Sequence, residues 1–481
     1  MRKTFVSNLL LLVAVNLLIK PFYLLGIEAE IQDRTGPEAF GSYFALINFS
    51  YLLNILPDLG VTNWNTRRVA SQPGQLPSLF PVLLSVRGLM SMVYLVLVLL
   101  CGLLLGYSSS QMGILALLAG NQVLASALLY LRSNLAGLHL FRQDSLLSVL
   151  DRAILVVFMA ALLWWPGSST FQMEWLVWGQ TMAYGLSVIA ALALVARHAG
   201  GIRFRWDGPQ ARRVLRESMP FALLILLSGL ALRMDSVLLE RIDTARAAGD
   251  YAMGFRFFDA VTMVAFLFAG LLLPIFSRMH ERSEAIAPLL GTAFRIMSSG
   301  LWIMACCGVA WPGEILAVFY RNPTPDAVHA FSILMVGCAA FSMQYVYGTL
   351  LTAMGALRAL VGIAAVALGI NLILNLALIP HYGAVGSALA NVGAQTTALV
   401  LQVIFVHRLV KPAMARDYRR LFVFAACSAA ILAAVLSGAG TIKALAFPYG
   451  AAVFISLSLL VAMGTRVLDF RAFLNLLKMK E

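Results

Sequence analysis

The chain has 481 residues, of which 61% are hydrophobic and only 12% are charged. A water-soluble fold of this length would expose far too much apolar surface, so the composition excludes a soluble globular protein and indicates lipid as the main solvent. The net charge of +13 does not indicate nucleic acid binding, because the cations are spread through short segments beside apolar runs, where anionic lipid headgroups explain them.

Apolar runs of about 20 residues predict membrane-spanning helices, because every backbone N–H and C=O group in lipid needs a partner within the protein. The fold class is therefore an all-α polytopic membrane protein with about 14 transmembrane helices. The predicted spans are residues 7–27, 40–64, 82–106, 112–131, 146–165, 174–196, 217–239, 251–274, 292–312, 327–350, 359–379, 384–406, 419–437 and 445–464.

The start of the chain could be a secretory signal or a first retained span. Arg2 and Lys3 precede an apolar run, but no small-residue cleavage pattern follows, and Lys20-Pro21 interrupts the run. We expect a retained span.

The distribution of Lys and Arg predicts the orientation, because translocation of cations in short loops is disfavoured. With these spans, 27 of the 35 Lys and Arg residues fall on the side of the two chain ends, five fall on the other side, and three lie inside spans. We therefore expect an even number of spans with both termini in the cytoplasm.

The charges inside the spans carry most of the functional information. Each cation costs about 2.5–3.5 kcal/mol near the centre of a membrane unless it is paired or hydrated. Lys20, Arg233 and Arg256 all lie about 9–12 Å below the outer surface. Asp235 and Asp259 accompany them, and Arg256 and Asp259 can pair because they are three residues apart. The pattern predicts a hydrated cationic cavity, although the long side chains could instead extend to the outer interface.

Asp58 stands near the cytoplasmic end of the second predicted span. It could form a cytoplasmic gate or an ion site. Capping of a helix, or pairing with Arg67 or Arg68, would explain it equally well.

An internal repeat predicts two halves. The stretch Ala39–Tyr43 after the first span is echoed by Ala247–Tyr251 after the seventh. A repeat of six helices in the same orientation is one way to build a transporter. We expect an N-terminal lobe at 1–205, a C-terminal lobe at 206–410, and two further helices with a cytoplasmic tail at 411–481.

Four motifs resemble those of a known family. They are Gly36-x-x-x-Phe40-Gly41-x-Tyr43, Asp58-x-Gly60, Leu273-Pro274 and the segment Ile379-Pro380-His381-Tyr382-Gly383-Ala384-Val385-Gly386-Ser387-Ala388. With them the chain resembles the polysaccharide transporter branch of the MATE-like MOP exporter superfamily, which includes the Wzx-type O-antigen and repeat-unit flippases. The resemblance implies two six-helix lobes, alternating access, and an undecaprenyl-pyrophosphate-linked oligosaccharide as cargo. It also implies a place in the bacterial cytoplasmic (inner) membrane.

Together, the residues and the resemblance predict a flippase rather than an enzyme, with no cofactor and no metal. Lys20, Arg233 and Arg256 would bind the pyrophosphate, since guanidinium groups suit phosphate oxygens. Asp58, Asp235 and Asp259 would balance charge or couple an ion. Expected partners are the lipid-linked glycan, anionic lipids and polysaccharide-assembly proteins, without nucleic acid.

Three alternatives remain open at the level of sequence. A cation-coupled multidrug exporter of the same superfamily would favour an acidic cavity. A flippase for a lipid-linked peptidoglycan precursor would differ only in cargo. A membrane polysaccharide polymerase or ligase would need a larger outer platform than loops of about a dozen residues provide.

Overall fold

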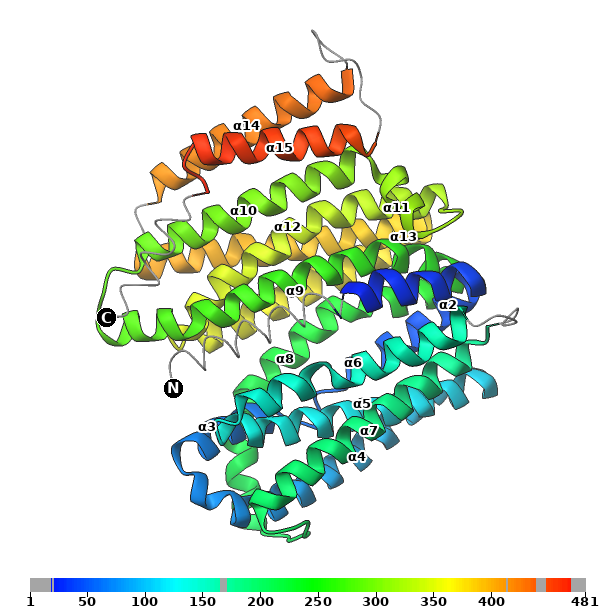
Figure 1. The fold of residues 1–481 in the computed structure, drawn as a ribbon, viewed down its shortest axis with the longest axis vertical. Coiled ribbons are helices and arrows are strands. Elements are labelled where there is room, and N and C mark those ends of the chain that lie inside the picture. Colours follow the sequence, from blue (N-terminus) through cyan, green and yellow to red (C-terminus); the bar gives the residue numbers. More distant parts are fainter. Residues whose placement is uncertain (1–18, 20, 165–170, 412–413, 438–446, 469–481) are drawn as a thin grey trace. The chain divides into compact units, whose positions relative to one another are not determined.

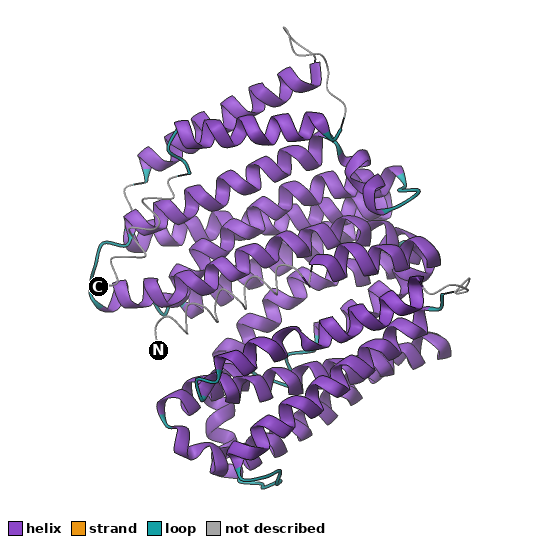
Figure 2. Cartoon of the chain, viewed as in Figure 1, coloured by secondary structure: helices purple, strands orange, loops and turns teal. Residues whose placement is uncertain are grey.

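A computed structural model describes residues 19, 21–164, 171–411, 414–437 and 447–468 (Figure 1). These residues are mostly helical, with short loops and turns between the helices, and they contain no strand (Figure 2). This confirms the predicted all-α membrane fold. Most of the first predicted span, and Lys20 with it, lies outside the described residues.

The chain divides into two compact units, Met1–Gly249 and Asp250–Glu481. The helices of the first unit are η1 (Tyr23–Ile27), α2 (Glu28–Leu52), α3 (Val61–Ser71), η2 (Pro73–Gln75), α4 (Leu76–Leu104), α5 (Ser109–Gly137), α6 (Phe141–Trp164), α7 (Met173–Ala199) and α8 (Gly208–Ile242). Helix α9 (Ala245–Glu281) begins in the first unit and continues into the second. The second unit adds α10 (Ala287–Ala310), α11 (Pro312–Phe319), α12 (Pro325–Ala353), α13 (Leu357–Val410), α14 (Ala415–Ser437) and α15 (Tyr449–Gly464).

Ten of the described helices are long and apolar enough to cross a membrane, and one of them, α13, covers two predicted spans. In the first unit, α5 packs against α7 and α3, and α8 packs against α2. The buried core of this unit includes Phe80, Leu83 and Leu131. Met92, Val96 and Leu104 on α4 are more than 60% exposed, as expected for side chains that face lipid. The lobe boundaries predicted after residues 205 and 410 stay predictions.

The second predicted span, residues 40–64, is broken. Helix α2 ends at Leu52, and α3 begins at Val61. Between them, Leu59 and Gly60 both adopt positive φ angles, of 46° and 76°. Such angles lie outside the right-handed helix region, so the helix cannot continue through this segment. The apolar content of the run did not reveal the break.

Helix α13 is a helical hairpin. At Gly383 the backbone leaves helical geometry, with φ 49° and ψ −125°. Beyond this point the chain runs back along itself, since the Ser387 hydroxyl donates to Asn375 Oδ1 at 3.0 Å and Ala398 packs near Ala367. A Cβ atom on Gly386 would lie 2.5 Å from the Leu378 carbonyl oxygen. The glycines of this motif therefore permit the tight hairpin that the sequence predicted.

The two repeated stretches meet at their glycines within the first unit. A Cβ atom on Gly41 of α2 would lie 1.7 Å from the Ala245 carbonyl oxygen, and one on Gly249 would lie 1.9 Å from the Pro37 carbonyl oxygen. The Gln32 amide also donates to the Gly249 carbonyl oxygen at 2.8 Å. We call this contact the glycine crossing; only residues without a side chain allow two backbones to approach so closely.

Candidate functional site

The predicted site residues fall in both units. Arg233 and Asp235 lie on α8 and Asp58 lies between α2 and α3, all in the first unit, whereas Arg256 and Asp259 lie on α9 in the second. The common layer expected for the cations stays a prediction.

Arg233 is half-buried among polar and aromatic groups of α2. Its Nη1 atom donates to Asn48 Oδ1 at 3.4 Å, and its guanidinium lies 5.4 Å from the centre of the Tyr51 ring. The next carboxylate along α8, that of Asp235, is 1% exposed. A half-buried guanidinium beside an aromatic ring combines a positive charge with several directional N–H donors.

Arg152 is a helix cation that the sequence analysis missed, because it was counted with the cytoplasmic cations although it lies six residues inside the predicted span 146–165. The structure extends α6 from Phe141 to Trp164, which places Arg152 close to the middle of the helix. Its guanidinium lies 4.9 Å from the Tyr23 ring centre and 5.7 Å from that of Tyr184.

Polar contacts hold these aromatic groups in place. Arg152 Nη2 donates to the Tyr184 hydroxyl at 3.1 Å, and Arg152 Nε lies 3.7 Å from Asp151 Oδ2. The Gln180 amide donates to the Tyr43 hydroxyl at 2.7 Å. These side chains come from α2, α6 and α7, so the helix packing of the first unit positions them.

Aromatic rings accompany both arginines. The Tyr51 ring lies beside the Arg233 guanidinium, and the Tyr23 and Tyr184 rings lie beside that of Arg152. We call Arg152, Arg233, Tyr23, Tyr51 and Tyr184 the arginine–tyrosine cluster. Two guanidinium groups framed by phenol rings combine positive charge with directional donors, an arrangement suited to phosphate oxygens.

The second unit holds Arg256 in a related environment. Its side chain is 2% exposed, its Nη1 atom donates to the Tyr320 hydroxyl, and its guanidinium lies 5.8 Å from the centre of that ring. Tyr320 follows α11, a short helix that the sequence analysis did not predict. Asp259 lies three residues further along α9 and is partly exposed.

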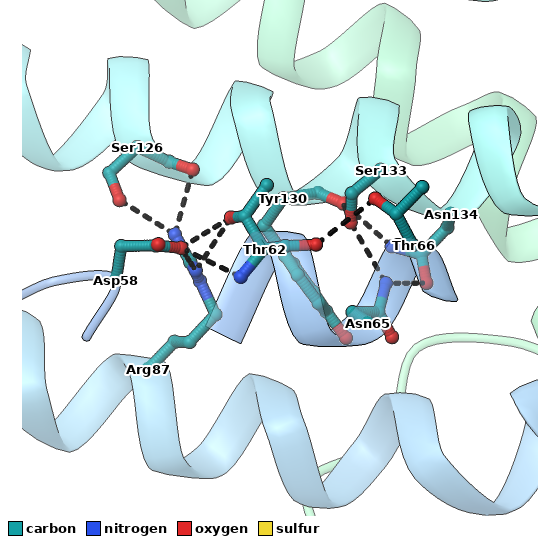
Figure 3. Close-up of polar contacts among 9 residues, drawn as sticks. All are labelled: Asp58, Thr62, Asn65, Thr66, Arg87, Ser126, Tyr130, Ser133 and Asn134. Carbon is teal, nitrogen blue, oxygen red and sulfur yellow. Dashed lines mark hydrogen bonds and ion pairs between the residues drawn. The ribbon is translucent and has the colours of Figure 1, made fainter. Parts of the chain in front are cut away.

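Asp58 forms an ion pair with Arg87 of α4, a partner that the sequence analysis did not consider (Figure 3). It also accepts a hydrogen bond from the Thr62 backbone N–H at 3.1 Å, near the start of α3. Arg87 is 5% exposed, and its Nη2 atom donates to the Ser126 carbonyl and hydroxyl oxygens at 2.8 and 2.6 Å. The Asp58 charge is therefore compensated here, and its role in gating or ion coupling stays a prediction.

A second set of contacts continues this network between α3 and α5 (Figure 3). The Asn65 amide donates to the Ser133 hydroxyl at 2.8 Å and to Asn134 Oδ1 at 3.0 Å. The Arg87 guanidinium lies 4.8 Å from the Tyr130 ring centre. Both sets of contacts join α3 to its neighbours, so they stabilise the short helix that follows the break.

Within the described residues, no group of three or more His, Cys, Asp or Glu side chains could hold a metal ion. The polar chemistry of the two units is instead that of guanidinium, phenol and amide donors. These groups bind anions by charge and hydrogen bonds.

Comparison with known proteins identifies the family of the chain. Residues 7–280, more than half of the chain, match the family described as polysaccharide biosynthesis protein. One curated relative, the uncharacterized membrane protein MJ1375 of Methanocaldococcus jannaschii, is 23% identical over 199 residues. That match spans 41% of this chain and 46% of the relative, so the chain covers less than half of the length of this relative.

Solved structures share the fold at low sequence identity. The lipid II flippase MurJ in an inward closed conformation aligns with a TM-score of 0.70 and 15% identity, covering 96% of this chain and 98% of its own. An inward-facing multidrug resistance MATE family transporter of the MOP superfamily aligns with a TM-score of 0.59 and 13% identity over 84% of this chain and 98% of its own. A MOP superfamily transporter from Pyrococcus furiosus aligns with a TM-score of 0.56 and 10% identity over 84% of this chain and 94% of its own. These likenesses confirm the predicted fold.

Proposed function

The chain belongs to the polysaccharide biosynthesis protein family, and from this premise we propose that it is a flippase for an undecaprenyl-pyrophosphate-linked oligosaccharide, the repeat unit of an O-antigen, capsule or exopolysaccharide. Such a cargo cannot cross hydrocarbon unaided, because its sugar hydroxyls and pyrophosphate would lose their hydration. A protein that moves it must replace that hydration with polar groups at membrane depth.

The observation that carries this proposal is the presence of guanidinium groups inside membrane helices of both units. Arg152 and Arg233 lie in the first unit and Arg256 in the second. A cation near the centre of a membrane costs about 2.5–3.5 kcal/mol unless it is paired or hydrated. A bound anion offsets that cost, so a pyrophosphate is a chemically suitable cargo group.

In the proposed mechanism, alternating access exposes these groups first to the cytoplasm and then to the outer side. Arg152, Arg233 and Arg256 donate to the pyrophosphate oxygens, and Lys20 adds a further charge. Tyr51 and Tyr320 keep the guanidinium planes oriented. Asp235 and Asp259 limit the excess positive charge or take part in ion coupling. The polyprenyl chain stays in lipid throughout.

The proposed location is the bacterial cytoplasmic membrane with both termini in the cytoplasm. The distribution of Lys and Arg between the two sides supports this orientation. In this orientation, transport begins at the leaflet on which cytoplasmic enzymes assemble a lipid-linked glycan.

The proposal is tested by replacing Arg233 or Arg256 with Ala in cells that depend on this chain for surface polysaccharide. Loss of charge-assisted hydrogen bonds to phosphate predicts a decrease in transfer of at least about tenfold, with near-normal membrane abundance. Arg246→Ala serves as the control, because Arg246 is an exposed residue near the start of α9. Full transfer by both site variants would refute the assignment.

Further measurements separate the alternatives. A repeat-unit flippase leaves undecaprenyl-linked repeat units on the inner leaflet when it fails, whereas a peptidoglycan-precursor flippase leaves that precursor instead. A multidrug exporter would change drug accumulation without either lipid product. A polymerase or ligase would still form product in detergent, while a flippase requires two separated compartments.

A further inference from the structure

A dense basic cluster lies where α10, α14 and the segment after α15 come together in the second unit. Arg295 is buried on α10, and its Nε atom lies 3.3 Å from Asp417 Oδ1 at the start of α14. Arg295 Nη1 donates to the carbonyl oxygen of Arg466 at 3.3 Å. These contacts fix the position of one carboxylate among several arginines.

The cluster carries excess positive charge. Arg420 lies close enough to three arginines to be repelled by their charge, and the Asp417 carboxylate attracts it; the three are Arg295, Arg416 and Arg466. Arg416 and Arg466 are exposed. In the predicted orientation this end of the unit faces the cytoplasm, where anionic headgroups attract basic groups beside the membrane.

An apolar cavity of about 490 Å³ adjoins the cluster, within the range of about 300–1,000 Å³ typical of ligand pockets. Its walls include Met343 of α12 and Leu399, Val403 and Ile404 of α13. Ile404 is 40% exposed, so the cavity is open at the side of the helix. A flexible hydrocarbon chain could enter from lipid without crossing a polar barrier.

The cavity and the basic cluster are continuous along two helices. Phe294 and Tyr418 line the cavity, and their neighbours in sequence are Arg295 and Asp417. The Tyr418 hydroxyl lies 3.2 Å from His407 Nε2 and 3.2 Å from the Tyr347 hydroxyl. This hydrogen-bonded wall marks the change from an apolar interior to a polar rim.

Arg408 occupies that rim. It lines the same cavity, its side chain is exposed, and among the described residues no carboxylate forms an ion pair with it. The apolar cavity opens sideways and suits the acyl chain of an anionic lipid. The guanidinium at its rim, with further arginines behind it, suits the phosphate of the headgroup.

We propose that this cavity is a binding site for an anionic glycerophospholipid of the cytoplasmic leaflet, with an acyl chain between α12 and α13 and its phosphate beside Arg408 and the basic cluster. The site is separate from the residues proposed to bind the transported pyrophosphate. It therefore stands whether or not the flippase assignment holds.

The test measures lipid binding to the purified full-length protein by native mass spectrometry, with dioleoyl-phosphatidylglycerol and dioleoyl-phosphatidylcholine as probes. These lipids have the same acyl chains, so the comparison isolates the headgroup. We expect the first adduct of phosphatidylglycerol to form at about tenfold lower concentration than that of phosphatidylcholine. Equal binding of the two lipids would overturn the proposal.

Two pairs of variants locate the site. Val403→Phe fills the cavity, whereas Val400→Phe, on the same helix and 49% exposed, does not. Arg408→Gln removes the charge at the rim, whereas Arg358→Gln removes an exposed charge near the start of α13. We expect Val403→Phe and Arg408→Gln each to weaken the phosphatidylglycerol adduct about tenfold, with the controls unchanged.

Three other results would overturn the proposal. The cavity variants could bind phosphatidylglycerol as well as their controls do. Undecaprenyl phosphate could displace phosphatidylglycerol at equal or lower concentration, which would assign the cavity to the carrier lipid. Val403→Phe could dissociate a dimer seen by light scattering, which would assign this surface to a second copy of the chain.

Discussion

The glycine crossing provides the sharpest test of the fold. Replacing Gly41 by Ala adds one methyl group 1.7 Å from the Ala245 carbonyl oxygen, and a Cβ atom essentially never approaches another heavy atom closer than 3.0 Å. The backbones of α2 and α9 must therefore move apart by at least 1.3 Å at this point. Because the opposing atom belongs to the backbone, no side-chain rotation can relieve the contact.

The magnitude follows from two opposing effects. In an open helical position, Gly→Ala stabilises a helix by about 1 kcal/mol. At Gly41, overpacking against backbone costs about 1–3 kcal/mol or more. A loss of about 1 kcal/mol in the free energy of unfolding lowers the melting temperature by about 2–4 °C. We therefore expect the melting temperature of Gly41→Ala to lie several degrees below that of the matched control.

The control is Gly113→Ala on α5, because a Cβ atom there meets nothing within 4 Å. The assay is thermal unfolding of the purified proteins in one detergent, followed by tryptophan fluorescence. Gly249→Ala should match Gly41→Ala, and the double variant should be less than additive because both methyl groups open the same crossing. Equal melting temperatures for Gly41→Ala and Gly113→Ala would refute the close approach.

Three further predictions concern the charged residues. Arg87→Ala leaves the Asp58 carboxylate without its buried partner, so the free energy of unfolding in detergent should fall by about 3–5 kcal/mol. Adding Asp58→Asn to the same chain should recover part of this loss, and no recovery would contradict the pairing. Arg152→Lys keeps the charge but loses the planar fork, so glycan transfer should fall about tenfold at normal membrane abundance, while unchanged transfer would remove Arg152 from the site. Asp417→Asn removes a carboxylate from the basic cluster, so native mass spectrometry should show tighter binding of phosphatidylglycerol, and weaker binding would contradict the proposed electrostatics.

Several features of the fold were predictable from the sequence because they depend on sums over local residues. The free energy of transferring an apolar run from water to lipid is approximately the sum of the contributions of its residues. The long apolar runs therefore identified the membrane helices. The Gly383 motif was recognisable for a similar reason, since a reversal between two apolar runs needs a residue with unusual backbone freedom.

The candidate site was only partly predictable. Arg233 and Arg256 were identified because they were assigned to the interior of predicted spans. Arg152 lies at least as far inside the predicted span 146–165 as Arg256 does inside 251–274, but it was counted with the cytoplasmic cations, and the observed extent of α6 shows that it is central to its helix. A signal was nevertheless present: Asp151 and Arg152 interrupt an otherwise apolar stretch that continues for more than ten residues on one side.

By itself, the sequence determined the membrane class, the approximate helices and the surplus of cations, because hydropathy and charge act residue by residue along the chain. The tertiary structure alone decided that Asp58 pairs with Arg87, that Arg152 lies beside Tyr23 and Tyr184, and that Gly41 contacts the start of α9. These contacts join residues from 29 to more than 200 positions apart. Their partners are selected by helix packing, a property of the whole unit that no local pattern encodes.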